Sequence, residues 1–140
     1  MIGAIAGDMI GSTRELGQLK TKDFPLFETR SQYTDDTVMT IAIAHALAHN
    51  KPFAETLQRF GRKYHNAGYG KEFKIWINND NPKPYGSWGN GAAMRVTAIG
   101  LFCIGDKKCI FPLHRCKLSV YCNQVRQRLT RREAGRKGGS

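Results

Sequence analysis

The sequence predicts an all-α protein, and three observations lead to that prediction. The first 100 residues contain no run in which apolar and polar residues alternate with the period of a strand. Two segments carry residues that favour helix starts, Thr34 before two aspartates and Pro52 before an amphipathic run. The chain has 140 residues, 41% hydrophobic and 24% charged, which fits one globular domain.

The first expected helix covers residues 2–16, which are rich in Ala, Ile and Met. Gly3, Gly7 and Gly11 recur every four residues and so share one face of that helix. Three glycines on one face predict the close approach of a neighbouring helix or of a ligand. Residues 20–33, with a proline and no clear period, are expected to form a loop.

Thr34 is expected to cap a second helix, whose acidic first turn suits the helix dipole and which continues to about His49. A third helix opens at Pro52 and carries an apolar stripe at helical spacing, made of Phe53, Leu57, Phe60 and Tyr64. Glycines, asparagines and prolines between residues 68 and 86 predict a stretch that is mostly loop. A last helix is expected to start within residues 92–96.

The distribution of charge divides the chain into two parts. Residues 1–100 hold 12 Lys and Arg against 9 Asp and Glu, whereas residues 101–140 hold 10 against 2. We therefore expect a helical part over residues 1–102 and a basic tail over residues 103–140 that is disordered or non-native. The tail also contains all four cysteines of the chain: Cys103, Cys109, Cys116 and Cys122.

Three interpretations of the tail are open: a solvated segment, a zinc site and a nucleic-acid-binding segment. The cysteines, with His114, lack the paired Cys-x-x-Cys spacing of structural zinc sites. The basic run from Arg126 to Lys137 has phosphate-binding charge, but no aromatic residue follows Tyr121 to stack on bases. We expect a solvated tail and no nucleic-acid partner.

The N-terminal segment does not have the pattern of a secretory signal or a membrane span. No apolar run approaches the roughly 18 residues that a membrane span needs. Asp8 interrupts the first apolar stretch, and no basic region precedes it. We expect a cytoplasmic chain without a membrane partner.

The first segment that could carry chemistry is Thr34-Asp35-Asp36-Thr37. Carboxylate and hydroxyl oxygens are hard donors, and they suit Mg²⁺ or a similar cation. The same residues also make an ordinary helix cap with an acidic first turn.

The second segment runs from Tyr85 to Arg95 and places Gly89-Asn90-Gly91 before a helix. A helix N-terminus of this kind offers free N–H groups to a phosphate, although a plain glycine-rich turn has the same composition. Tyr85 and Trp88 are candidates either for stacking on a base or for the core. In the first helix, Asp8 and Glu15 lie seven residues apart on roughly one face, where each alone is typical of a solvated or capping residue.

Taken in order, these segments resemble the ADP-ribosylglycohydrolase family, which includes the dinitrogenase-reductase-activating glycohydrolases. The resemblance rests on Gly-Ala-Ile-Ala-Gly-Asp-Met-Ile-Gly-Ser followed by Glu15, on residues 31–37, and on residues 86–96, and it covers residues 1 to about 100. It implies an all-helical orthogonal bundle with a binuclear Mg²⁺ centre, or Mn²⁺ in its place. It also implies hydrolysis of the bond between ADP-ribose and a modified protein side chain, at the anomeric carbon.

The resemblance assigns roles to individual residues. Thr34, Asp35 and Asp36 match part of the family's metal ligands, and the two aspartates share the catalytic centre with Glu15, which matches an acidic residue over the metals and substrate. The segment Gly89, Asn90, Gly91, Ala92, Ala93 and Met94 matches the loop that holds the diphosphate and ribose. The implied partner is an ADP-ribosylated protein or ADP-ribose itself.

The chain also departs from the family pattern. The family's second metal motif, Asp-x-Asp-Thr, does not occur after Thr37, and neither does a Thr-His pair. We therefore expect a truncated or frameshifted member, incomplete at its C-terminus, whose helices leave apolar faces bare and favour self-association. The alternative to an active hydrolase is a catalytically dead fragment that binds ADP-ribose or a protein partner.

Overall fold

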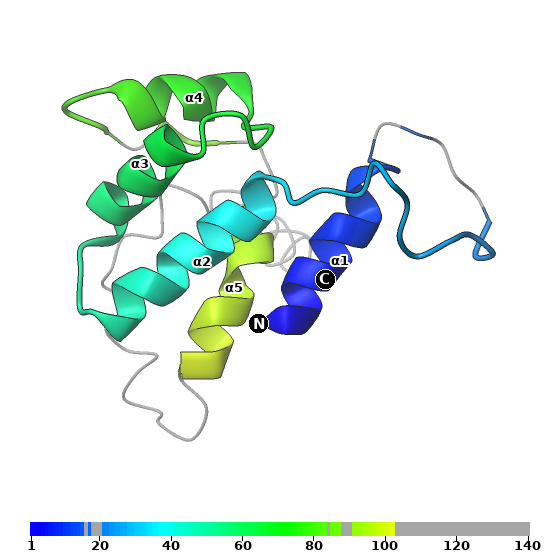
Figure 1. The fold of residues 1–140 in the computed structure, drawn as a ribbon. Coiled ribbons are helices and arrows are strands. Elements are labelled where there is room, and N and C mark those ends of the chain that lie inside the picture. The colour runs from blue at the N-terminus through cyan, green and yellow to red at the C-terminus, as the bar shows by residue number, and fades with distance from the viewer. Residues whose placement is uncertain (16, 18–20, 84, 88–90, 103–140) are drawn as a thin grey trace, which may run out of the picture.

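The structure is a computed structural model that describes residues 1–15, 17, 21–83, 85–87 and 91–102. Within these ranges the chain forms helices and no strand, which confirms the all-α prediction. The helices are α1 (Ile2–Ser12), α2 (Asp35–Ala48), α3 (Phe53–Lys63), α4 (Lys71–Asn78) and α5 (Gly91–Phe102). Figure 1 shows α2 in the middle, with α1 on one side of it and α3 and α4 on the other.

Helix α2 begins as its sequence predicts and supplies much of the core. The Thr34 hydroxyl accepts a hydrogen bond from the Asp36 N–H at 3.3 Å, and Asp35 and Asp36 occupy the first turn. Apolar residues lie on more than one face of α2, as a helix packed on several sides requires. It packs against α3, α5 and, less extensively, α1. The position of the other helices therefore depends on α2.

Helices α3 and α4 pack as a pair against the core. Leu57 of α3 is buried there, together with Trp76 of α4. Gln58 is also buried, and its amide nitrogen donates to the carbonyl of Trp76 at 3.1 Å and to that of Asn79 at 2.7 Å. Carbonyls at the end of a helix lack intrahelical partners, so Gln58 completes the C-terminus of α4.

Gly61 of α3 lies directly against Ile77 of α4, and Gly61→Ala is expected to destabilise the protein by about 2 kcal/mol. A Cβ at this position would lie 2.6 Å from Cδ1 and 2.9 Å from Cγ1 of Ile77, which is itself buried. Urea denaturation followed by circular dichroism measures the loss. The matched control is Gly70→Ala, because a Cβ there meets no atom within 4 Å. Equal stability of the two variants would contradict this close packing.

Helix α4 corrects the prediction of a mostly loop stretch between residues 68 and 86. Phe73, Trp76 and Ile77 lie at helical spacing, and all three are buried. An isolated helix of eight residues is marginal in water, so burial against α3 stabilises α4 more than its own propensity does. The glycines and asparagines on either side conceal this short pattern in the sequence.

Two further helix ends differ from the prediction. Helix α1 ends at Ser12 instead of residue 16, so Glu15 lies in the turn that follows it. Tyr64 is the C-cap of α3 and is 36% exposed, so the buried stripe of α3 stops before it. Pro52 precedes α3 as its N-cap.

The glycine face of α1 is not packed against a helix in the described part of the chain. A Cβ built at Gly3, Gly7 or Gly11 would meet no atom within 4 Å. The prediction of a closely packed neighbouring helix is therefore wrong for the described residues. Gly7 and Gly11 instead line a cavity, which leaves a ligand as the open interpretation.

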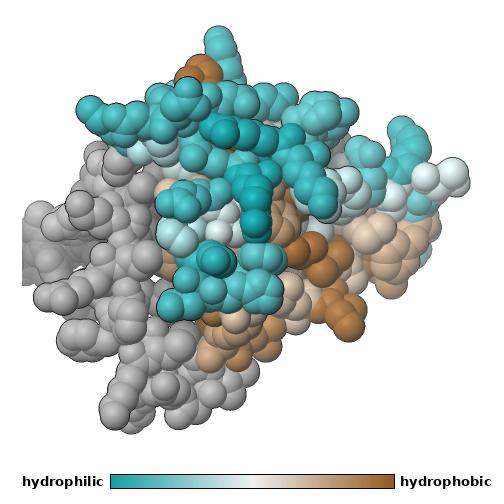
Figure 2. Space-filling view, turned by 60° about the vertical axis from the view of Figure 1, so that its left-hand side comes forward, coloured by the Kyte–Doolittle hydropathy of each residue, from teal (hydrophilic) through white to brown (hydrophobic). Residues whose placement is uncertain are grey.

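Several large apolar side chains of α1 and α5 are exposed. Ile2 is 84% exposed, Val96 is 55% exposed and Leu101 is 45% exposed. Figure 2 shows hydrophobic residues gathered toward the lower part of the described surface. Self-association through such a surface stays a prediction. Among the described helices, none has the length and apolar character to cross a membrane.

Candidate active site

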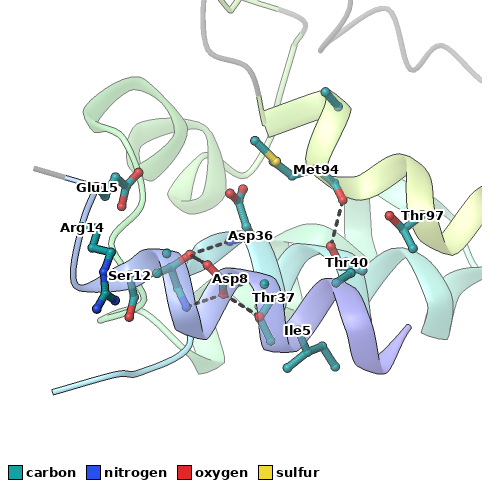
Figure 3. A pocket seen from close by; sticks show the side chains of 15 residues that line it. Ile5, Asp8, Ser12, Arg14, Glu15, Asp36, Thr37, Thr40, Met94 and Thr97 are labelled. Carbon is teal, nitrogen blue, oxygen red and sulfur yellow. Dashed lines mark hydrogen bonds between the residues drawn. The ribbon is translucent and has the colours of Figure 1, made fainter. Parts of the chain in front are cut away.

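A cavity of about 630 Å³ is lined by residues of α1, α2 and α5, and its size is in the usual range for small-molecule sites. Glu15 reaches it from the turn after α1, Asp36 from the first turn of α2, and Met94 from α5. Figure 3 shows these side chains around the cavity, together with the hydrogen bond in which the Thr40 hydroxyl donates to the Met94 carbonyl. Segments far apart in sequence thus share one concave surface.

The structure brings together five of the residues that the sequence analysis singles out. They are all lining residues of the cavity: Glu15, Thr34, Asp36, Ala93 and Met94. Their roles in catalysis, metal binding and substrate binding stay predictions, but their common location is a property of the fold.

The other predicted residues lie elsewhere or outside the description. Asp35 is half-buried and does not line the cavity; its Oδ1 lies 3.9 Å from where a Cβ on Gly68 would be. Gly91 and Ala92 form the start of α5. Gly89 and Asn90 lie outside the described residues, as do Trp88 and the tail over residues 103–140 with its cysteines.

Asp8 of α1 connects the start of α2 to the cavity. Its Oδ1 accepts a hydrogen bond from the Thr34 hydroxyl at 2.6 Å. Its Oδ2 accepts from the Thr34 N–H at 2.8 Å and from the Thr37 hydroxyl at 2.5 Å. One carboxylate therefore satisfies three donors at the N-terminus of a helix, where negative charge is also favoured by the helix dipole.

The two aspartates of α2 are held in a negative environment. The pKa of Asp36 is raised from 3.8 to about 6, chiefly by burial and secondarily by the negative charges of Asp35 and Asp8. Burial also raises the pKa of Asp35, whereas the positive charge of Arg95 lowers it. The negative charge of Glu15 raises the pKa of both aspartates. Crowded carboxylates of this kind attract a cation.

The raised pKa of Asp36 predicts a pH-dependent stability when no divalent cation is present. Between about pH 4 and pH 6 the folded chain holds a proton that the unfolded chain has released, so this contribution to stability is lost as pH rises. In EDTA, Asp36→Asn is expected to be more stable than the wild type by about 1 kcal/mol above pH 7, since solvent screens a half-buried carboxylate.

Urea denaturation at two pH values checks this expectation. The advantage of Asp36→Asn should vanish below about pH 3, under the unfolded-state pKa of 3.8, where the carboxyl is mostly protonated in both states. An advantage that is the same at both pH values would contradict the raised pKa.

Arg95 is a buried cation beneath the start of α5. It is 5% exposed, and its guanidinium lies 5.3 Å from the centre of the Phe73 ring. A Cβ on Gly91 would stand 2.6 Å from Nη2 of Arg95, so a side chain at Gly91 would displace the guanidinium. Glycine at this position therefore lets Arg95 turn back along α5, where its charge lowers the pKa of Asp35 and Asp36.

Arg14 fixes the turn that carries Glu15. Its Nη2 donates to the Pro25 carbonyl at 2.7 Å and to Glu28 Oε1 at 2.6 Å, and its Nη1 donates to the Ile10 carbonyl at 2.9 Å. The guanidinium therefore joins the end of α1 to the loop over residues 25–28. Its side chain is only 14% exposed, so solvent screens these bonds weakly.

Arg14→Met is expected to lower the free energy of unfolding by about 2 kcal/mol, because it removes several charge-assisted hydrogen bonds at once. The matched control is Arg30→Met. Arg30 also pairs with Glu28, at 3.6 Å, but its side chain is 84% exposed, so the control should lose less than about 0.5 kcal/mol. Chemical denaturation compares the two, and similar losses would contradict the role of Arg14.

The oxygen donors at the cavity fit a hard cation. Thr34 and Asp36 present a hydroxyl and a carboxylate there, with Glu15 as a further carboxylate. In the described part of the chain, no three His, Cys, Asp or Glu side chains gather as a metal site. The fit therefore depends on the hydroxyl oxygen as well as on the carboxylates.

Sequence reasoning placed Asp8 and Arg95 in segments that could carry chemistry but gave neither residue a role of its own, and it did not single out Arg14. The signal for Asp8 was available, since the sequence predicts a first helix in which Asp8 and Glu15 lie on roughly one face. The signals for Arg14 and Arg95 were weaker, because an arginine in a sequence is more often solvated than buried.

Comparison with known proteins identifies the family of the chain. The sequence model of the ADP-ribosylglycohydrolase family matches residues 1–117, which extends beyond the boundary predicted at residue 102. The ADP-ribosylhydrolase ARH3 of Xenopus tropicalis is 31% identical, over 72% of this chain and 37% of the frog protein. The chain thus spans well under half the length of that relative, and no solved structure matched it. Since the family match covers most of its length, the chain belongs to the ADP-ribosylglycohydrolase family.

Proposed function

We propose that the chain hydrolyses the bond between ADP-ribose and a modified protein side chain, at the anomeric carbon and with Mg²⁺. The observation that carries the proposal is the meeting of Glu15, Asp36 and Met94 around one cavity of about 630 Å³. These residues come from three separate segments, each matching a different part of the resemblance. A cavity of this size accommodates a nucleotide-sized ligand.

Thr34 and Asp36 would hold the metal ion, with Asp35 as a neighbouring carboxylate. When bound, Mg²⁺ orients hydroxyl oxygens and lowers the pKa of a coordinated water, and Mn²⁺ has the same oxygen preference. The support is the donor chemistry of these side chains and the raised pKa of Asp36, which reflects burial of its carboxylate first and the nearby charges of Asp35 and Asp8 second. The binuclear character and the dinitrogenase-reductase-activating type stay predictions, as does the cytoplasmic location.

Glu15 and the start of α5 would handle the attacking water and the diphosphate. Glu15 is exposed at the edge of the cavity, where its carboxylate accepts a proton from the attacking water or orients it. The first turn of α5, from Gly91 to Met94, has backbone N–H groups without intrahelical partners, and these suit the diphosphate. The ligand itself is ADP-ribose or an ADP-ribosylated protein.

A second candidate function is binding of ADP-ribose without turnover. The specific observation in its favour is that no three His, Cys, Asp or Glu side chains gather as a metal site in the described part of the chain. In this case the cavity holds the ligand, and the reaction lacks a complete metal centre.

Release of ADP-ribose from an ADP-ribosylated protein tests the proposal. We expect release that requires Mg²⁺, stops with EDTA and falls by about 100-fold or more in Glu15→Gln. Glu55→Gln is the matched control, because Glu55 is exposed on α3 and does not line the cavity. ADP-ribose binding without release would support the second candidate and overturn the first.

A further inference from the structure

We propose that Asp8 is a positioning residue for the metal ion, acting through the hydroxyl group of Thr34; this inference rests on the proposed function. Both carboxylate oxygens of Asp8 are engaged with the first turn of α2. Oδ1 accepts from the Thr34 hydroxyl at 2.6 Å, and Oδ2 accepts from the Thr34 N–H at 2.8 Å and the Thr37 hydroxyl at 2.5 Å. Figure 3 shows Asp8 beneath Asp36 at this junction.

The orientation of the Thr34 hydroxyl follows from its hydrogen bonds. A hydroxyl has one proton to donate and two lone pairs that accept. The proton goes to Asp8 Oδ1, and one lone pair accepts the Asp36 N–H at 3.3 Å. One lone pair remains for a cation. Without Asp8 the Thr34 hydroxyl is free to rotate. Its proton can then point toward the cation position, where the remaining lone pair would otherwise lie.

Asp8 also determines where α1 lies against α2. Helix α1 has no buried residue, so apolar packing in the described part of the chain holds it weakly. The three hydrogen bonds to Asp8 connect α1 directly to the start of α2. Because Glu15 lies just beyond the end of α1, Asp8 contributes to where Glu15 lies relative to Asp36, together with the Arg14 bonds that hold the turn.

Asp8 is better suited to positioning than to direct coordination. A carboxylate has about four acceptor sites, and three of them are occupied by Thr34 and Thr37. Partners of metal ligands that fix ligand orientation typically change metal affinity by about 10- to 100-fold when they are replaced. The amide of asparagine keeps one acceptor oxygen but loses the other. Asp8→Asn therefore removes some of the hydrogen bonds to Thr34 and Thr37 with little change in the shape of the side chain.

Calorimetric titration of Mg²⁺ and Ca²⁺ into the full chain tests the proposal. Asp8→Asn is expected to weaken Mg²⁺ binding by about 10- to 100-fold. Binding of Ca²⁺ should weaken much less, because Ca²⁺ tolerates irregular geometry whereas Mg²⁺ requires near-octahedral ligands. Asp80→Asn is the matched control, since the Asp80 side chain is fully exposed, and it should leave both affinities unchanged.

Comparing the Mg²⁺ affinities of single and double variants tests whether Asp8 acts through the Thr34 hydroxyl. Thr34→Val removes the hydroxyl that Asp8 orients. If Asp8 acts through this hydroxyl, adding Asp8→Asn to Thr34→Val produces little further loss of Mg²⁺ affinity. Thr37→Val keeps every proposed ligand but frees one Asp8 contact, and it should weaken Mg²⁺ binding several-fold. If circular dichroism shows that Asp8→Asn does not fold, Thr37→Val replaces it in the test.

The possible results distinguish failure of the positioning role of Asp8 from failure of the proposed Mg²⁺-dependent function. Unchanged Mg²⁺ affinity in a folded Asp8→Asn, or in Thr37→Val, overturns the positioning role and leaves the proposed function intact. Equal losses of Mg²⁺ and Ca²⁺, or additive losses with Thr34→Val, overturn it in favour of direct coordination. Absence of Mg²⁺ binding by the wild type overturns the proposed function, and the inference with it.

Discussion

Asp36→Asn is expected to weaken Mg²⁺ binding by more than about 100-fold, since even indirect partners of a metal contribute 10- to 100-fold. Asp36 is the carboxylate of the Thr34–Asp36 segment that lines the cavity. Its raised pKa shows that the folded chain holds its negative charge at a cost, which a cation would offset. Asparagine keeps the shape but removes that charge.

Calorimetry with Mg²⁺ measures this effect directly. The matched control is Asp80→Asn, an identical substitution at a fully exposed side chain, and it should bind Mg²⁺ as the wild type does. The same Asp36→Asn protein should be somewhat more stable without metal, so misfolding does not explain its loss of binding. Wild-type affinity in Asp36→Asn would place the cation elsewhere.

Ile43→Ala is expected to lower the free energy of unfolding by about 3–4 kcal/mol. Ile43 is one of the largest fully buried side chains, at 0% exposure, in the helix that packs against α3, α5 and α1. Truncation leaves a void that these helices cannot easily fill. Since domains of this size are stable by only about 5–15 kcal/mol, the loss removes a large share of the total.

Ile43→Val provides the control for this prediction, because it removes one methylene and should lose about 1 kcal/mol. Urea denaturation of both variants in the same buffer gives the comparison. If alanine and valine had similar stability, the centre of α2 would not be the core of the fold.

The helices were predictable wherever local chemistry determines them. Thr34 caps α2 as its hydroxyl and the following aspartates predict, and Leu57 lies in the core as the spacing of α3 predicts. The start of α5 near residue 92 was also predictable. Each of these elements begins at a residue whose side chain favours a helix start, or carries several apolar residues at helical spacing.

The sequence was a weaker guide where tertiary contacts determine whether a helix forms or where it ends. Helix α4 depends on burial of Phe73 and Trp76, and the end of α1 depends on bonds made by Arg14 to a distant loop. The candidate site shows the same contrast between local motifs and tertiary contacts. Local motifs identified Glu15, Thr34 and Asp36, whereas the role of Asp8 follows from hydrogen bonds across 26 to 29 residues of sequence, which no local pattern reports.

Titration of ADP-ribose into the full chain, with Mg²⁺ and then with EDTA, shows whether the cavity is a metal-dependent ADP-ribose site. We expect saturable binding that requires Mg²⁺ and is lost in Asp36→Asn, while Asp80→Asn binds as the wild type does. Binding that is equally strong in EDTA, or no binding by a folded wild-type chain, would contradict the assignment of the cavity as a metal-dependent ADP-ribose site.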